Sequence, residues 1–130
     1  MRHVFFAGLL ALAVTIASDP AAAHHSFAVF DMAAQKTVSG TVKRVDWTNP
    51  HIWIWMDVAN GKGGTDVYGF EGMSPNFLER RGWKRTTLKV GDPITVVYRP
   101  LRDGTNGGMF LSTKLADGTA LSMGGGQPTN

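Results

Sequence analysis

Residues 51–58, HIWIWMDV, alternate between aliphatic side chains and larger or polar ones. Such alternation is typical of a β-strand with one buried face. The side chains predicted to face a core are Ile52, Ile54, Met56 and Val58. Those predicted to face outward are His51, Trp53, Trp55 and Asp57. The segment therefore predicts a strand whose outer face carries one histidine and two tryptophans.

Further strand signals occur on both sides of this segment, separated by stretches rich in Gly, Asn and Asp. They predict strands at residues 37–47, 66–71, 93–98, 109–115 and 120–123. The first of these strands is expected to bend or bulge near Gly40 or Arg44. We expect it to place Val42 on one face, and Val45 and Trp47 on the other.

A short helix is predicted at residues 74–81, SPNFLERR. Ser74 can cap its start, Pro75 suits the first turn, and Gly82 follows as a stop. The order of elements is then three strands, a helix and two or more strands, which is the order of an OB-type barrel. We predict an all-β fold with one short helix, as a five- to six-stranded OB-like antiparallel barrel. Another antiparallel barrel or a small sandwich is the alternative.

The first 23 residues have the three parts of a secretory signal peptide. Arg2 provides the positive start, residues 4–17 form an apolar run, and Ala21 and Ala23 fit the small-residue rule for cleavage. The apolar run is shorter than the roughly 20 residues that a membrane-spanning helix needs. We therefore expect cleavage after Ala23, export to the periplasm and no membrane span in the mature chain.

The mature chain is predicted to form one domain at residues 24–123, with an extended segment at 24–36 and a disordered tail at 124–130. It has no cysteine, which excludes disulfides and thiolate metal sites. The formal net charge is +3 without a run of like charges, so a nucleic-acid partner is not indicated. No catalytic motif is present, and no enzyme activity is predicted.

The histidines predict a metal site. Cleavage after Ala23 would make His24 the first residue, able to chelate an ion through its amino and ring nitrogens. A second imidazole completes a nearly planar nitrogen set, which suits Cu(II). His51 is the expected third ligand and His25 an additional or substitute donor, in a copper carrier or an accessory to a periplasmic oxidoreductase. The alternative is that these histidines are solvated or bond a neighbouring loop.

A second candidate site is aromatic. Trp53 and Trp55, with Trp47 nearby, are expected to form a surface that binds a small ligand or a partner protein. The alternative is that other parts of the chain cover these rings, so that they form a second small core. Glu71 is expected to pair with an arginine near the helix, or to take part in an anion site there.

Several motifs, taken in order, resemble a family of small exported Gram-negative proteins described only as a domain of unknown function. They include His24-His25-Ser26-Phe27, Trp47-Thr48-Asn49-Pro50-His51, Ser74-Pro75-Asn76 and Arg81-Gly82-Trp83. The resemblance covers residues 23 to about 123. It implies a small exported protein that is mostly β, and it implies no activity, substrate or cofactor.

Overall fold

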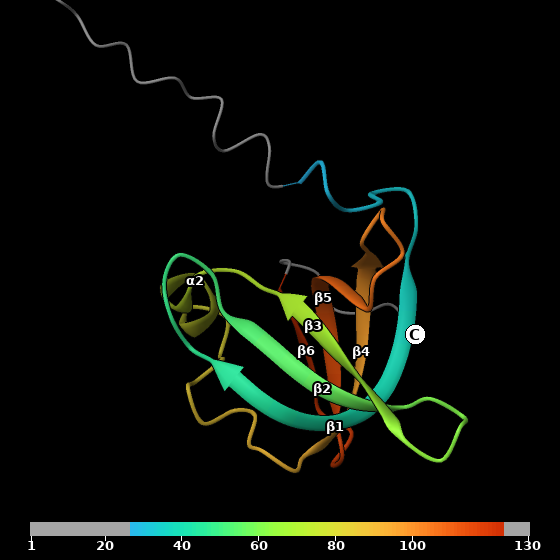
Figure 1. Ribbon diagram of the computed structural model, residues 1–130. Coiled ribbons are helices and arrows are strands. Elements are labelled where there is room, and N and C mark those ends of the chain that lie inside the picture. The colour runs from blue at the N-terminus through green and yellow to red at the C-terminus, as the bar shows by residue number, and fades with distance from the viewer. Residues whose placement is uncertain (1–26, 124–130) are drawn as a thin grey trace, which may run out of the picture.

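The computed structural model describes residues 27–123, whose strands curve around one core (Figure 1). In chain order the elements are β1 (Lys36–Asp46), β2 (Trp53–Ala59), β3 (Thr65–Glu71), α2 (Pro75–Glu79), β4 (Pro93–Pro100), β5 (Gly107–Leu115) and β6 (Ala120–Ser122). Within this range the regular structure is β apart from α2. The predicted all-β class with one short helix is therefore confirmed.

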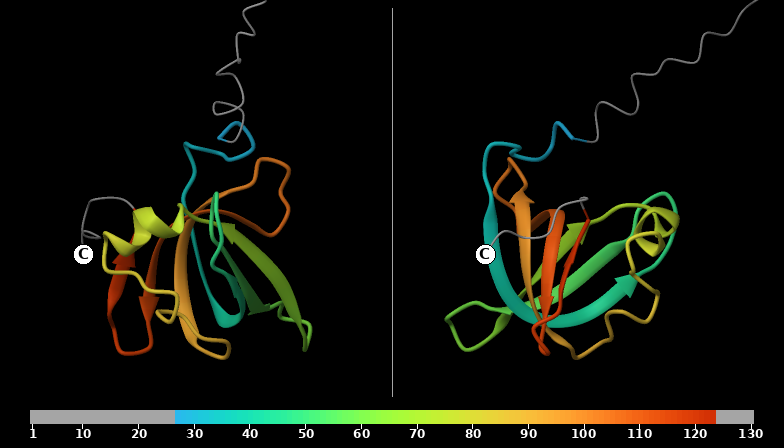
Figure 2. Two further views of the ribbon diagram at one scale, coloured as in Figure 1. Left: turned by 90° about the vertical axis from the view of Figure 1, so that its left-hand side faces the viewer. Right: turned by 180° about the vertical axis from the view of Figure 1, so that it is seen from behind.

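The strands form a closed barrel with one extra strand. β1 pairs antiparallel with β2 and with β4, β2 with β3, and β4 with β5. β5 then pairs parallel with β3, which closes the ring of five strands, and β6 adds to β5 (Figures 1 and 2). With α2 between β3 and β4, this connectivity is that of the OB fold. The predicted OB-like barrel is confirmed, although its closing joint is parallel.

A bulge in β1 changes which side chains reach the core. The pairing of β1 with β2 shifts by one residue between Val42 and Arg44, as the sequence suggested for this region. One extra residue reverses the alternation that follows it. Val45 and Trp47 therefore lie on the core side, like Val42, and the prediction that they occupy the opposite face is wrong.

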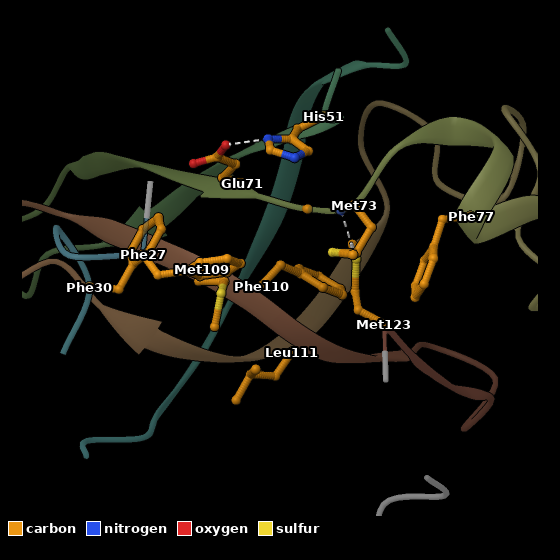
Figure 3. A pocket seen from close by; sticks show the side chains of 11 residues that line it. Phe27, Phe30, His51, Glu71, Met73, Phe77, Met109, Phe110, Leu111 and Met123 are labelled. Carbon is orange, nitrogen blue, oxygen red and sulfur yellow. Dashed lines mark hydrogen bonds and ion pairs between the residues drawn. The ribbon is translucent and has the colours of Figure 1, made fainter. Parts of the chain in front are cut away.

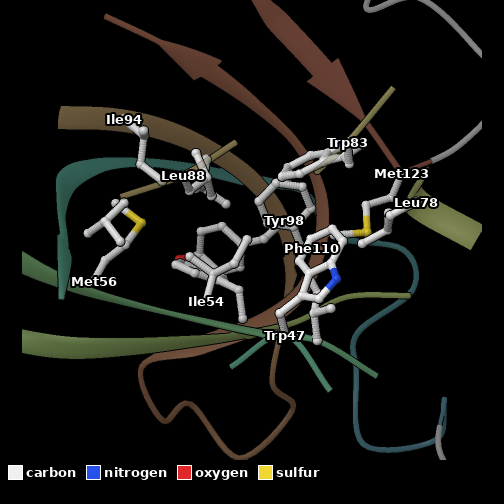
Figure 4. Packing of buried hydrophobic residues seen from close by; sticks show 14 of the residues in the cluster. Trp47, Ile54, Met56, Leu78, Trp83, Leu88, Ile94, Tyr98, Phe110 and Met123 are labelled. Carbon is white, nitrogen blue, oxygen red and sulfur yellow. The ribbon is translucent and has the colours of Figure 1, made fainter. Parts of the chain in front are cut away.

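The inner face of β2 supplies the centre of the core, as its alternation predicts. Ile54 and Met56 are fully buried, and so is Ile52 just before the strand. The residues packed with them include Val42, Phe70, Leu78, Trp83, Leu88, Ile94, Val96, Tyr98 and Phe110 (Figure 4). Full burial of one such side chain contributes roughly 1.5–3 kcal/mol. This packing stabilises a chain that has no disulfide.

Glycines allow β3 and β5 to meet. Gly107 has a φ of +119°, and a Cβ there would overlap the carbonyl oxygen of Gly69. Gly108 has the corresponding role between β5 and β4, since a Cβ there would overlap the carbonyl oxygen of Arg99. The sequence predicted a strand that begins at residue 109, whereas β5 begins at Gly107. The absence of a side chain at Gly107 lets β5 approach β3 and close the barrel.

The helix is shorter than the sequence suggested, since α2 covers five residues, Pro75–Glu79. Ser74 lies at its N-cap but makes no side-chain capping bond. Instead, the Ser74 carbonyl accepts hydrogen bonds from the backbone N–H groups of Phe77 and Leu78. Leu78 and Trp83 are buried and pack the helical segment against the core.

The start of the described chain lies beside the connection between β4 and β5 (Figures 1 and 2). Phe30 forms an isolated β-bridge with Leu101, and the Asp31 N–H donates to the Pro100 carbonyl at 2.8 Å. Bends and turns at residues 27–29 and 32–33 precede the start of β1 at Lys36.

The predicted signal peptide (1–23) and the predicted tail (124–130) lie outside the described residues. Between residues 27 and 123, no helix has the length and apolar character needed to cross a membrane.

Candidate functional site

An apolar pocket of about 290 Å³ opens where β3 ends and β5 begins (Figure 3). Four phenylalanines and three methionines provide most of its lining: Phe27, Phe30, Phe77, Phe110, Met73, Met109 and Met123. Among the described residues that line it, His51 and Glu71 are the ionisable ones. A small apolar pocket with a few polar groups at one edge is the usual form of a binding site.

His51 and Glu71 form a close pair at this edge. His51 follows the turn that contains the cis Asn49–Pro50 bond, and Glu71 is the register partner of Trp53 at the end of β3. The two strands therefore bring His51 Nδ1 to 2.6 Å from Glu71 Oε1. The side chains are 39% and 22% exposed, so the pair is partly shielded from water.

The pairing determines which nitrogen of His51 can bind a ligand. A carboxylate can only accept hydrogen bonds, so the tautomer of His51 that fits this contact has its hydrogen on Nδ1 and donates a hydrogen bond to Glu71. In that tautomer the lone pair is on Nε2, which no described residue engages by a hydrogen bond. The arrangement can therefore offer one oriented imidazole nitrogen at the edge of the pocket.

The sequence interpretation assigned Glu71 a different partner, and that assignment is wrong. Glu71 pairs with His51 rather than with an arginine of the helical segment. Arg81 lies over the ring of Phe77 instead, with its guanidinium carbon 3.5 Å from the ring centroid. The register of β2 and β3 decides this outcome, because it places Glu71 beside the residues that precede Trp53.

Of the predicted copper ligands, only His51 falls among the described residues; His24 and His25 lie outside them. Phe27, three residues after His24, lines the same pocket as His51. Within residues 27–123, no three His, Cys, Asp or Glu side chains gather closely enough to hold a metal ion.

The predicted aromatic surface is only partly present. Trp53 and Trp55 stack on each other, with ring centroids 5.5 Å apart and planes at 16°. Trp55 also lies against Gly69, where a Cβ would be 2.6 Å from its ring, and donates its indole N–H to Asp46 at 3.0 Å. The guanidinium carbon of Arg44 lies over the Trp55 ring, 5.1 Å from its centroid. Contacts within the protein therefore already occupy much of this aromatic surface.

Trp47, the third predicted ligand-binding tryptophan, does not join this surface. It is 6% exposed and belongs to the core, because the bulge in β1 turns it inward. The structure therefore separates Trp47 from the pair at Trp53 and Trp55.

Comparison with known families gives a match over most of the chain. A family model described as "Family of unknown function (DUF6152)" matches residues 11–111. The chain belongs to this family. The expected resemblance to a domain of unknown function is thereby confirmed, and the DUF6152 match includes His51, Glu71, Met73 and Met109. No curated protein and no solved structure matches the chain.

The three pocket methionines of this DUF6152 chain were not predicted as site residues. Met73 follows β3, Met109 lies in β5 and Met123 follows β6, so each belongs to a different part of the sequence. No spacing or motif connects them, and only the closure of the barrel brings them to one pocket.

Proposed function

We propose that this protein is exported to the periplasm, where it binds Cu(II) through His51 and the histidines at the start of the mature chain. The signal peptide at residues 1–23 would direct export, and its removal would expose His24. The observation that carries the proposal is the hydrogen bond between His51 Nδ1 and Glu71 Oε1, at 2.6 Å.

A paired histidine of this kind suits a metal. Histidines that bind metals almost always donate their second ring N–H to a carboxylate, a carbonyl or water. That bond fixes the orientation of the ring and raises the basicity of the coordinating nitrogen. Glu71 would serve this role, holding His51 with Nε2 as the ligand atom.

The remaining ligands would come from residues 24 and 25. Three residues span at most roughly 10–11 Å when extended, and Phe27 contacts the pocket that His51 also lines. A free amino group and ring nitrogen from His24, with Nε2 of His51, make the three-nitrogen set that favours tetragonal Cu(II). His25 is the additional or substitute donor.

The test uses protein produced by export, with its N-terminus determined by mass spectrometry. Titration with Cu(II) should give a one-to-one complex with a dissociation constant below about 1 μM, and an EPR spectrum with nitrogen couplings. His51→Ala should weaken the complex, and so should acetylation of the amino terminus at His24, because it blocks the chelating amino group. A mature chain that starts at His24 and forms no such complex would contradict the proposal.

A further inference from the structure

Methionine is concentrated around the proposed copper ligand. Three of the five methionines between residues 27 and 123 line the pocket that holds His51. The other two differ, since Met56 is fully buried in the core and Met32 is 43% exposed on the surface. The pocket therefore combines one imidazole with three thioether side chains.

Backbone pairing brings two of these methionines close to His51. The Ile52 N–H donates to the Met73 carbonyl at 3.0 Å, which places residue 73 beside the residue that follows His51. Met109 is the register partner of Glu71 in the parallel joint of β3 and β5, and Glu71 holds His51. Figure 3 shows His51 and Glu71 at one edge of the pocket, Met109 and Met123 across from them with Phe110 between, and Met73 near Met123.

The third methionine is held in place by the same segment. The sulfur of Met123 accepts a hydrogen bond from the Met73 N–H at 3.3 Å. Gly72 leaves the space for it, since a Cβ there would lie 2.5 Å from the Met123 methyl carbon and 3.2 Å from its sulfur. Met123 is 5% exposed, so its thioether faces the protein and the pocket rather than bulk water.

We infer that the pocket binds Cu(I), through His51 and the thioether sulfurs of Met73 and Met109, with Met123 behind them. The inference rests on the proposed copper function, and it adds an oxidation state and sulfur ligands to it. Thioethers select Cu(I) over harder cations. The chain has no cysteine, so imidazole and thioether are its soft donors.

The lining of the pocket favours the lower charge of Cu(I). Burying an ion in apolar surroundings costs free energy that rises with the square of its charge, so a monovalent ion is penalised less than a divalent one. The phenylalanines around the methionines provide such surroundings. Unlike the Cu(II) complex, this site uses only residues within 27–123 and does not need a free amino terminus.

Methionine also fills irregular apolar gaps without binding anything, and substitution by leucine separates the two roles. The probe is Ag(I), a redox-inert monovalent ion that shares the preference for sulfur, added as silver nitrate in chloride-free buffer to the exported chain. Methionine methyl groups are followed by ¹H–¹³C NMR. We expect one equivalent to shift the signals of Met73 and Met109, and to leave those of Met56 and Met32 unchanged.

The double variant combines Met73→Leu and Met109→Leu, and the matched control variant is Met32→Leu. The double variant should bind Ag(I) at least about tenfold more weakly, while the control binds like the parent chain. Unshifted Met73 and Met109 signals, or equal affinity of the double variant and the parent, would overturn the inference.

A chain whose amino terminus at His24 is acetylated separates this inference from the proposed function. It should lose the Cu(II) complex and keep the Ag(I) response. If the authentic chain binds Cu(II) but Ag(I) shifts neither methionine, the thioether site is wrong and the proposed function stands. If Ag(I) shifts both methionines but no Cu(II) complex forms, the proposed amino-terminal complex is wrong and the thioether site stands.

Discussion

The two ends of the barrel carry hollows of different character. At the end where β3 meets β5, the pocket of about 290 Å³ is apolar and has His51 and Glu71 at its edge. At the opposite end, a wider and more open hollow of about 680 Å³ mixes apolar side chains with short polar ones and includes Asp57 and Lys114. The larger hollow is the more polar of the two and the more open to water.

Each end also has one close pair of side chains on the outer side of β2 or just before it. His51 and Glu71 are 2.6 Å apart and partly shielded. Lys43 and Asp57 are 3.1 Å apart, and the lysine side chain is 52% exposed, so water and salt compete for that pair. The comparison teaches that the surroundings of a pair, more than its presence, distinguish a candidate site from an ordinary surface contact.

The largest effect is expected from breaking the joint that forms the pocket end. Gly107→Ala should destabilise the protein by more than about 3 kcal/mol, since it combines an unfavourable positive φ with an overlap against Gly69. Urea denaturation followed by circular dichroism measures this loss. The control is Gly63→Ala at the other end, where φ is +85° but nothing lies within 4 Å of a Cβ.

Gly63→Ala should lower the free energy of unfolding by only about 1–2 kcal/mol, because only the left-handed backbone conformation is unfavourable there. Equal losses in the two alanine variants would show that close contact at Gly107 does not limit closure of the barrel.

A smaller effect is expected from removing the carboxylate of one pair and then of the other. Glu71→Ala should weaken Cu(II) binding by roughly 10–100-fold, as expected for a residue that orients a metal ligand. Asp57→Ala, a matched truncation at the other end, should leave the affinity unchanged. Isothermal titration of both variants makes the comparison, and a similar loss in each would remove the special role of the pocket end.

The smallest effect is expected from the exposed pair. Lys43→Ala should change the free energy of unfolding by less than about 1 kcal/mol, because solvent screens the interaction with Asp57. The difference from the parent chain should shrink further in 0.5 M salt, at an ionic strength where the screening length is roughly 4 Å. A loss of several kcal/mol, or one that salt leaves unaltered, would mean that this pair is structurally as important as the core.

Local patterns predicted much of the fold but little of the pocket. The alternation in residues 51–58 correctly assigned Ile54 and Met56 to the core, because side-chain direction in a strand has a period of two residues. The same reasoning failed for Trp47, since one bulged residue in β1 reverses that period. It also missed the partner of Glu71, which depends on strand register rather than on nearby sequence.

The sequence by itself determined the order of the elements, the apolar face of the central strand and the absence of disulfides. These features follow from neighbouring residues, whose side chains point in directions set by local geometry. Only the tertiary structure decided that Phe27, His51, Glu71, Met109 and Met123 share one pocket. Its physical cause is the closure of the barrel: β5 can approach β3 only where glycines leave room, and that approach brings together residues distant in the chain.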